Sequence, residues 1–432
     1  MTTTQPASAA LDHRWIRAQF PALDLQQDGR PVVYLDNPAG TQVPERTIAA
    51  IAEYLRTANA NVHGAFLTSV RTDAMLGTVR QALADFLGAA APHEIVLGPN
   101  MTTLTYLFSR ALGRDFAPGD EVIVTELDHD ANISPWLDLA ERGVVIRRAP
   151  VRLEDCTLDM AALAGLLSPR TRLVAVTYAS NAVGTVTDIA AIARLAHQAG
   201  ALVWVDAVHY GPHGPIDVQA LDVDFLVCSS YKFFGPHLGV LYGRADLLER
   251  ITPHQLRPAP HTGPEKYERG TKNHECLAGL AGTLDYLAEL GRRVADGAAP
   301  AAEPRRAALL RAMTAIRAYE QTLSAAMLAG LATVPGLRLY GIADPARLAE
   351  RVPTFAITLD GHPTAAVGRA LGAAGIFAWT GNYYALEIMQ RLGLEDTGGA
   401  VRIGTAHYNT LDEIDRLIGT LQHIAAGQSQ GL

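Results

Sequence analysis

The 432-residue sequence predicts an α/β fold in which a mostly parallel sheet is covered by helices on both faces. Short apolar runs alternate with stretches of helical apolar spacing over residues 31–285. The runs are continuous and rich in Val, Leu and Ile, which is typical of strands buried on both faces. The predicted strands are EIVLG (94–98), EVIVTE (121–126), RLVAVTY (172–178), ALVWVDA (201–207), DFLVCSS (224–230) and LGVLYG (238–243).

Helices are predicted between and around these strands. Residues 187–200 show the pattern clearly, because apolar residues recur at helical spacing and a glycine follows the last of them. A short amphipathic helix is predicted around residues 15–20, and a long helix over 304–332, after a connection rich in Ala, Gly, Pro and Arg at 286–305. Three later strands are expected within 334–341, 354–360 and 401–408.

These patterns divide the chain into three parts. Residues 1–30 form a tail and a helix that is expected to pack with the smaller domain. Residues 31–285 form the large α/β domain, and residues 286–432 form a smaller α+β domain. Ligands of open α/β sheets gather at the carboxyl ends of the strands, so the functional site is expected in the large domain.

Composition excludes several classes of protein. Hydrophobic residues make up 49% and charged residues 19% of the chain, which is enough to bury a core and excludes general disorder. The net charge of −8 argues against nucleic acid or an anionic membrane as the main partner. No apolar run has the length of a membrane span, and residues 1–13 lack the charged-then-apolar pattern that is expected of a secretion signal. The three cysteines, Cys156, Cys228 and Cys276, fit a reducing compartment, so we expect a cytoplasmic protein.

Lysine is rare in this sequence. Only three of the 36 basic residues are lysines, namely Lys232, Lys266 and Lys272. Arg cannot lose its proton to become a nucleophilic amine, so each lysine is a candidate for chemistry. Lys232 follows a buried strand among aromatic neighbours, where desolvation favours the neutral amine that a Schiff base requires. Lys266 is predicted to be a solvated loop charge, whereas Lys272 either faces water or touches a phosphate.

Polar residues follow the other predicted strands. The residues at the start of the helix around Thr102 either form a phosphate-binding site or only cap the helix. His129 and Asn181 either contact a ligand or belong to solvated loops and turns. Asp206 ends an apolar strand, and its carboxylate needs a charged or hydrogen-bonding partner because a buried, unpaired carboxylate is costly. Together with Lys232 these groups form the set that pyridoxal phosphate requires, and no metal-ligand set converges on the nearby histidines.

The order of these motifs resembles the fold-type-I pyridoxal-phosphate enzymes of aminotransferase class V, most closely the cysteine desulfurase and selenocysteine lyase branch. The resemblance runs from YLDNPAG (34–40) to YNTLDE (408–413). It implies a mixed, mostly parallel seven-stranded sheet and the cofactor pyridoxal 5'-phosphate. It also implies that Lys232 forms the Schiff base, that Asp206 pairs with the pyridinium nitrogen, and that His129 stacks on the ring.

Further roles follow from the same resemblance. Asn181 and His209 are expected beside the phenolic oxygen of the ring, and Arg402 is expected to clamp the substrate carboxylate. The family forms homodimers, and Thr271 matches a residue that reaches the phosphate of the partner subunit. The remaining phosphate contacts are expected from Met101, Thr102, Ser229 and Tyr231.

The sequence departs from the desulfurase pattern in the loop 379–385. Tyr384 stands where a desulfurase carries the cysteine that accepts sulfur, and no cysteine follows Cys276. Trp379 replaces an arginine, which indicates a larger or more apolar substrate, and Tyr383 is expected to line the substrate pocket with these two residues. His209 stands where the family usually has glutamine, and Tyr231 where it commonly has histidine.

The resemblance implies an enzyme that acts on a small-molecule substrate, an amino acid, through an external aldimine. The leading prediction is a desulfurase-like C–S lyase that works by β-elimination without a persulfide-forming cysteine. Transamination and epimerisation are alternatives, because the cofactor contacts do not separate them. A second alternative is a non-catalytic partner protein that keeps the fold, although such a protein has no need for Lys232.

Overall fold

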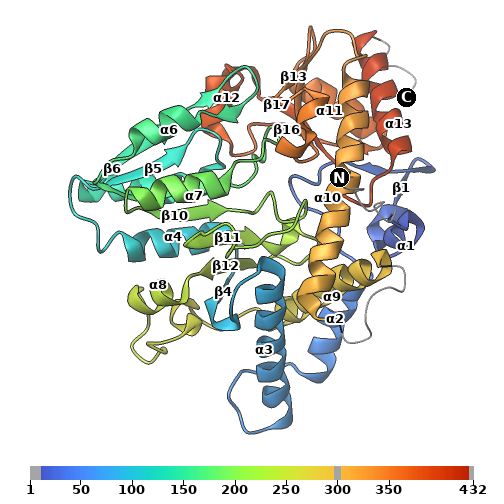
Figure 1. The fold of residues 1–432 in the computed structure, drawn as a ribbon. Helices are drawn as coiled ribbons and strands as arrows, with labels where there is room; N and C mark the ends of the chain where they lie inside the picture. Colours follow the sequence, from blue (N-terminus) through green and yellow to red (C-terminus); the bar gives the residue numbers. More distant parts are fainter. Residues whose placement is uncertain (1–10, 296–302, 428–432) are drawn as a thin grey trace, which may run out of the picture.

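The computed structural model describes residues 11–295 and 303–427 (Figure 1). Most of the predicted N-terminal tail and part of the predicted connection at 286–305 lie outside these ranges. The predicted α/β class is confirmed, because the centre of the chain forms a mixed seven-stranded sheet. Its strands are β4 (Ile95–Gly98), β5 (Glu121–Thr125), β6 (Val145–Ala149), β9 (Thr171–Thr177), β10 (Leu202–Asp206), β11 (Phe225–Ser229) and β12 (Gly239–Gly243).

The strand order is β4-β12-β11-β10-β9-β5-β6. β12 runs antiparallel to both of its neighbours, and the other pairs are parallel. All six predicted strands are present. The seventh, β6, lies at an edge with several exposed side chains, which explains why its sequence does not stand out as an apolar run.

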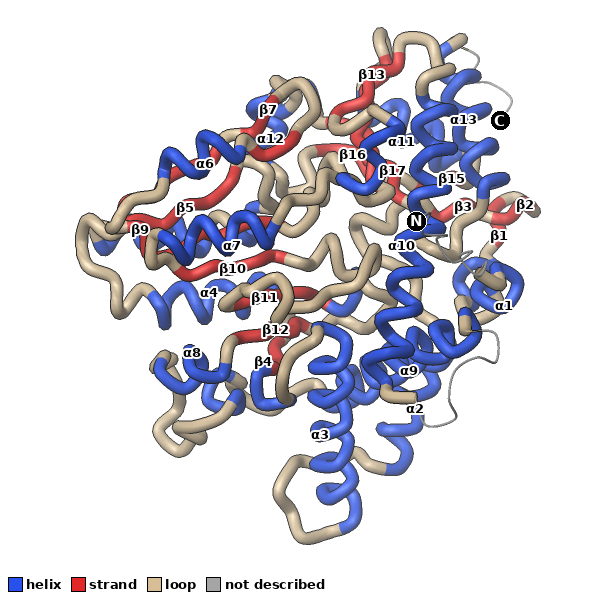
Figure 2. The backbone as a smooth tube through the Cα atoms, in the orientation of Figure 1, coloured by secondary structure: helices blue, strands red, loops and turns tan. Residues whose placement is uncertain are grey.

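Side chains of the central strands alternate between two cores. Val203 and Val205 of β10 belong to one cluster with α7, whereas Trp204 belongs to a second cluster with α4. Figure 2 shows α7 lying in front of β9 and β10. Both faces are therefore covered, which is why these strands read as continuous apolar runs. The helices of the first face are α3 (Leu67–Leu87), α7 (Ile189–Gln198), α9 (His274–Val294) and α10 (Arg305–Leu331), and those of the second are α4 (Met101–Leu112), α5 (Ser134–Leu137) and α8 (Ala245–Arg250).

A smaller antiparallel sheet follows in the C-terminal part. Its order is β13-β14-β17-β16, and α10, α11 and α13 pack on its core. In Figure 1 the long helix α10, which was predicted over 304–332, runs beside both sheets. The elements are β13 (Leu337–Tyr340), β14 (Thr354–Leu359), β16 (Trp379–Gly381), β17 (Ala400–Gly404), α11 (Thr364–Ala373), α12 (Leu386–Arg391) and α13 (Leu411–Ala425).

The proposed domain division at 285/286 falls inside α9, so the chain leaves the large sheet along a continuous helix rather than a loop. The division itself stays a prediction. The N-terminal helix α1 begins at His13, slightly before its predicted start, and Arg17 joins it to the C-terminal part through the Tyr408 carbonyl at 2.8 Å and Glu413 at 2.9 Å. No helix in the described ranges is long and apolar enough to cross a membrane.

Short elements complete the fold. β3 pairs in parallel with β15, so the N-terminal segment is tied to the C-terminal half by strand pairing as well. The short strands are β1 (Gln26–Gln27), β2 (Arg30–Pro31), β3 (Val33–Tyr34), β7 (Val151–Arg152), β8 (Thr157–Leu158) and β15 (Ile376–Phe377), and the remaining helices are α1 (His13–Arg17), α2 (Glu45–Thr57) and α6 (Met160–Leu166).

Candidate active site

A cavity lies at the carboxyl edge of the large sheet. It is formed by the start of α4 and by the loops that follow β5, β9, β10 and β11. This is where a parallel sheet collects ligands. Nine of the residues singled out in the sequence line it together: Met101, Thr102, His129, Asn181, Asp206, His209, Ser229, Tyr231 and Lys232.

Lys232 stands at the centre of this group. It ends a short 3₁₀ helix (Ser230–Lys232) that follows β11 directly, and it is buried. Its Nζ donates a hydrogen bond to the carbonyl of Pro38. Burial, helped by the charge of Arg402, lowers the pKa of Lys232 to about 7. The neutral amine needed for Schiff-base formation is therefore well populated at neutral pH.

Asp206 closes β10 beside Lys232. Its Oδ1 accepts a hydrogen bond of 2.8 Å from the Val208 amide. Burial raises the pKa of Asp206 to about 6, although that amide and the charge of Lys232 oppose the shift. Among the described residues, the buried Asp206 carboxylate lacks a close positive partner. A protonated ring nitrogen of a bound ligand would supply that positive charge.

His129 forms one wall of the cavity. Its Nδ1 accepts a hydrogen bond of 3.0 Å from the Ala131 amide, and burial lowers the pKa of His129 to about 3, so the ring is neutral. The Tyr384 ring stacks on it with centroids 5.6 Å apart and an angle of 24° between the planes. A flat, uncharged ring in this position suits an aromatic ligand.

Two further polar residues belong to the site but were missed in the sequence. Thr177, at the end of β9, lines the cavity. Asp128 is fully buried next to His129 and accepts a hydrogen bond of 2.7 Å from Asn132. Burial raises the pKa of Asp128 to about 8, and the neighbouring Asp206 contributes to the shift. Their positions in the sequence could have indicated both residues, because Thr177 ends an apolar strand and Asp128 follows shortly after one.

One end of the cavity is the N-terminus of α4. Asn100 caps this helix by accepting a hydrogen bond of 2.8 Å from the Thr103 amide. The Met101 amide donates to Ser229 Oγ at 3.0 Å, which joins the helix start to the end of β11. Thr102 is exposed there. Amide groups and hydroxyls at a helix start are suited to an anion such as phosphate.

Two buried polar atoms on the cavity wall lack a partner in the described part of the chain. They are Asn181 Oδ1 and His209 Nδ1. Asn181 Nδ2 donates to the Tyr383 carbonyl at 3.0 Å, and His209 Nε2 lies 2.9 Å from Thr354 Oγ1. Leaving a buried polar atom unpaired is costly, so these two atoms indicate a polar ligand.

The four expected substrate residues, Arg402, Trp379, Tyr383 and Tyr384, are not among the described residues that line the cavity, although three of them contact its wall, through Asn181 or His129. Arg402 is buried, donates to the Asn181 carbonyl at 3.1 Å, and lies 3.7 Å from Asp36. Its Nε has no hydrogen-bond partner among the described residues, and its guanidinium carbon lies 4.4 Å from the Tyr383 ring centroid. Trp379 pairs with Arg402 across β16 and β17. Trp379 and Tyr384 are exposed by 56% and 73%, so they are free to contact a ligand from outside.

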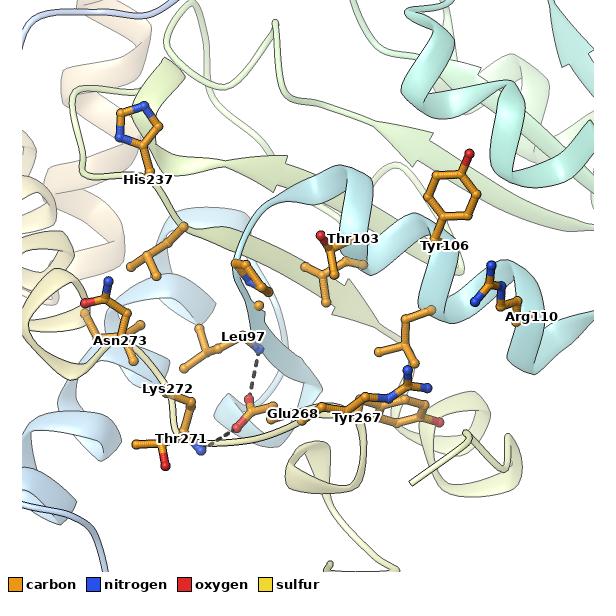
Figure 3. Close-up of a pocket in the computed structure, with 17 residues that line it drawn as sticks. Leu97, Thr103, Tyr106, Arg110, His237, Tyr267, Glu268, Thr271, Lys272 and Asn273 are labelled. Atoms are coloured by element: carbon orange, nitrogen blue, oxygen red, sulfur yellow. Dashed lines mark hydrogen bonds and ion pairs between the residues drawn. The ribbon is translucent and has the colours of Figure 1, made fainter. Parts of the chain in front are cut away.

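The structure does not bring Thr271 into this cavity. Thr271 lines a separate cleft of about 460 Å³ (Figure 3). Figure 3 shows Lys272 joined to Glu268, and their charged groups lie 2.9 Å apart, so Lys272 is ion-paired rather than surrounded by water alone. A contact between Lys272 and a phosphate stays a prediction. The prediction for Lys266 is wrong, because its side chain is buried and donates to the Glu249 carbonyl at 2.8 Å.

A buried lysine beside a carboxylate, at the carboxyl edge of an α/β sheet, is the arrangement that an enzyme acting through a Schiff base requires. Residues 33–303 and 307–417 match the family model described as Aminotransferase class-V, and the chain belongs to this family. The chain is 36% identical over 425 residues to the cysteine desulfurase of Klebsiella pneumoniae (strain 342), an alignment that covers 95% of this chain and 97% of that protein. It is 37% identical over 425 residues to the cysteine desulfurase of Pectobacterium atrosepticum, with the same coverage.

Solved structures show the same similarity. The apo cysteine desulfurase of Thermococcus onnurineus NA1 superposes with a TM-score of 0.84 at 26% identity, covering 99% of this chain and 100% of that one. The cysteine desulfurase CsdA of Escherichia coli gives a TM-score of 0.79 at 28% identity, covering 96% and 98%. The prediction of a pyridoxal-phosphate enzyme similar to cysteine desulfurases is confirmed, and the unpartnered polar atoms of Asn181 and His209 fit this cofactor.

Proposed function

We propose that this enzyme is a lyase that releases a sulfur or other leaving group from the β-carbon of an amino acid, without forming a protein persulfide. The observation that carries the proposal is the absence of a usable thiol at the site. Tyr384 occupies the loop over His129, and none of the three cysteines is among the described residues that line the cavity. Cys156 and Cys228 are buried, and burial raises the pKa of both thiols.

Pyridoxal phosphate, when bound, supplies an aldehyde for the substrate amine and an electron sink for charge that develops at the α-carbon. Lys232 holds the cofactor and, once released by the substrate amine, takes the proton from the α-carbon as general base. Its lowered pKa suits this role, because the amine accepts a proton only in its neutral form. Asp206 keeps the ring nitrogen of the cofactor protonated. A buried carboxylate is costly without a positive partner, and the protonated ring nitrogen would be that partner.

The other cavity residues are assigned by position. We place the phosphate at the start of α4, against Met101, Thr102, Ser229 and Tyr231. His129 covers one face of the ring and, together with Tyr384, excludes water from that side. Asn181 and His209 offer their unpartnered atoms to the phenolic oxygen side.

Arg402 is proposed to bind the substrate carboxylate. Its Nη1 donates to the Asn181 carbonyl, but its Nε has no partner among the described residues and its Nη2 makes only a long contact to Asp36, so the Nε and Nη2 side of the guanidinium has room for a carboxylate. Trp379 and Tyr383 lie beside Arg402, and Tyr384 lies over His129, so their rings favour a substrate with an apolar or extended side chain.

We also propose a homodimer in which Thr271 completes the phosphate site of the partner subunit. The phosphate end of the cavity opens to a wide surface hollow through Thr102, Tyr231 and His237. Thr271 lines a neighbouring cleft and does not reach the cavity of its own chain. Mixing a Lys232→Ala subunit with a Thr271→Val subunit tests this arrangement by subunit complementation.

A substrate screen tests the proposed reaction. The purified protein should be yellow and should bleach on borohydride reduction. Amino acids with a leaving group on the β-carbon should give pyruvate and ammonia, with sulfide from cysteine, in the presence of water alone. Turnover that requires a keto acid would indicate transamination, and racemised substrate without product would indicate epimerisation. Colourless protein that binds no added cofactor would contradict any catalytic role.

A further inference from the structure

A buried ion cluster lies in the wall of the cleft that Thr271 lines (Figure 3). Its centre is Glu268, whose side chain is only 1% exposed. Glu268 Oε2 lies 2.7 Å from Arg80 Nη2 and 2.9 Å from Lys272 Nζ, and Glu268 Oε1 accepts a hydrogen bond of 2.9 Å from the Leu97 amide. One carboxylate therefore holds α3, β4 and the segment before α9 together.

The contacts of this cluster make Glu268 a carboxylate at neutral pH. Burial alone would raise the pKa of Glu268, but the charges of Arg80 and Lys272 outweigh burial, and this pKa lies below its usual value. Arg80 also donates to the Ile95 carbonyl at 2.7 Å, so its guanidinium is fixed to β4 as well. Loss of the Lys272 charge would therefore leave Glu268 paired with Arg80.

The cluster fixes the base of the loop that carries Thr271. Lys272 folds back to Glu268 across four positions, so residues 269–271 form a loop closed by this ion pair. These three residues are exposed. Directly after Lys272, Asn273 caps the start of α9. The exposed part of the loop is thus held at its base by the ion pair on one side and by the helix cap on the other.

The same carboxylate is joined to the phosphate end of the cavity. Glu268 holds Leu97 of β4, and only two residues separate the end of β4 from Met101, the first residue of α4. The neighbouring Tyr267 ring stacks on Phe108 of α4 with centroids 4.6 Å apart. One packed unit therefore carries both the helix start assigned above to the phosphate of its own subunit and the loop assigned to the phosphate of the partner.

We propose that Glu268 and Lys272 position the Thr271 loop for the phosphate of the partner subunit, and so set the affinity of the dimer for pyridoxal phosphate. A loop that is already held in place loses less conformational entropy when the phosphate binds. Neither side chain needs to touch the cofactor, so both are positioning residues. The inference rests on the homodimer and on the role of Thr271 proposed above.

The first test compares two aldehydes that differ only in the phosphate. Lys272→Met removes the ion pair at a side chain that is 19% exposed, so the variant should fold. The dissociation constant of the cofactor-free variant for pyridoxal phosphate, measured by Schiff-base absorbance, should rise about 5- to 20-fold. The constant for pyridoxal, which lacks the phosphate, should change less than about twofold. Lys272→Arg keeps the charge and should restore most of the affinity.

Lys266→Met is the matched control. Lys266 precedes the loop in the same segment, and its Nζ donates to the Glu249 carbonyl at 2.8 Å rather than to the cluster. This variant should lose stability without a change in affinity for either aldehyde. If Lys272→Met weakens the binding of both aldehydes equally, the cluster only stabilises the fold and the inference is wrong.

A double variant separates positioning from a direct contact between Lys272 and the phosphate. If Lys272 acts through the loop, Lys272→Met should cause no further loss of affinity in a Thr271→Val background. Glu268→Gln should weaken pyridoxal phosphate as Lys272→Met does. A full additional loss in the double variant, or a gain of affinity when Glu268→Gln releases Lys272, would overturn the inference in favour of direct contact.

Thr271→Val alone separates the inference from the proposed function. If Thr271→Val weakens the binding of pyridoxal phosphate and Lys272→Met does not, the loop needs no ion pair and only the inference fails. If Thr271→Val leaves the affinity unchanged, the proposed role of Thr271 fails, and the inference fails with it.

Discussion

The two edges of the large sheet hold their charges in different ways. At the amino edge, where β5 and β9 begin, Glu121 lies 3.0 Å from Arg147 and Asp120 lies 2.9 Å from Arg172, and both arginines reach solvent. At the carboxyl edge, Lys232 donates to a backbone carbonyl and Asp206 accepts from a backbone amide, and both are buried.

This difference separates charges that stabilise from charges that react. At the amino edge, hydrogen bonds from Ser168 and Arg147 lower the pKa of Glu121, as expected for a paired carboxylate. At the carboxyl edge, burial moves the pKa of Lys232 down to about 7 and that of Asp206 up to about 6. Strongly shifted groups that converge on one cavity are typical of catalytic sites.

The largest expected effect is at Lys232. Lys232→Ala removes both the cofactor attachment and the general base, so turnover should fall by about 10⁴-fold or more. Product release and the absorption of the bound cofactor measure the two losses separately. Full activity in this variant would refute the assigned base. Arg172→Ala, at the amino edge, is the matched control and should leave turnover unchanged.

The next effect contrasts one carboxylate from each edge. Asp206→Asn should lower turnover about 10²–10³-fold, because the ring nitrogen loses its anionic partner. The folded pKa of Asp206 lies above its unfolded value, so its carboxylate costs stability as the pH rises through about 6. Asn removes this cost, and the free energy of unfolding of the cofactor-free protein at pH 8 should not fall.

Glu121→Gln should behave in the opposite way. The loss of the ion pairs to Arg147 and Arg170 should lower the free energy of unfolding by about 1–2 kcal/mol, with turnover unchanged. Denaturant unfolding and steady-state kinetics measure the two quantities. The comparison of the two edges fails if Glu121→Gln lowers turnover and Asp206→Asn does not.

A smaller effect is expected at Arg402. Arg402→Lys keeps the positive charge but loses the planar fork, so KM for the amino acid should rise about 10- to 100-fold while kcat changes less. Steady-state kinetics with the best substrate of the screen measure this split. An unchanged KM would exclude Arg402 as the carboxylate clamp.

The rate of covalent cofactor binding should depend on pH as expected for a buried lysine. Only the neutral amine attacks the aldehyde, so the rate at which cofactor-free protein binds pyridoxal phosphate covalently should rise through about pH 7. An ordinary lysine would show this rise above pH 10. Stopped-flow absorbance measures the rate, and a midpoint above pH 9 would show that Lys232 is not desolvated.

Much of the fold was predictable because burial on both faces leaves a simple signal. Six strands read as continuous apolar runs, whereas the edge strand β6 carries Arg147 and Arg148 and was missed. The cavity residues were predictable because they follow strands at one edge of the sheet. The pairing of His213 with Glu320 was not, since the two residues are 107 positions apart and α10 brings them together.

The most direct test of the central claim is the product formed from cysteine by a variant that lacks all three cysteines, Cys156→Ala, Cys228→Ala and Cys276→Ser. β-Elimination converts cysteine and water into pyruvate, ammonia and sulfide, whereas removal of sulfur as a persulfide leaves alanine. The account predicts pyruvate and sulfide in equal amounts, at a rate close to that of the unaltered protein. Alanine formed by the unaltered protein and lost in the cysteine-free variant would contradict it.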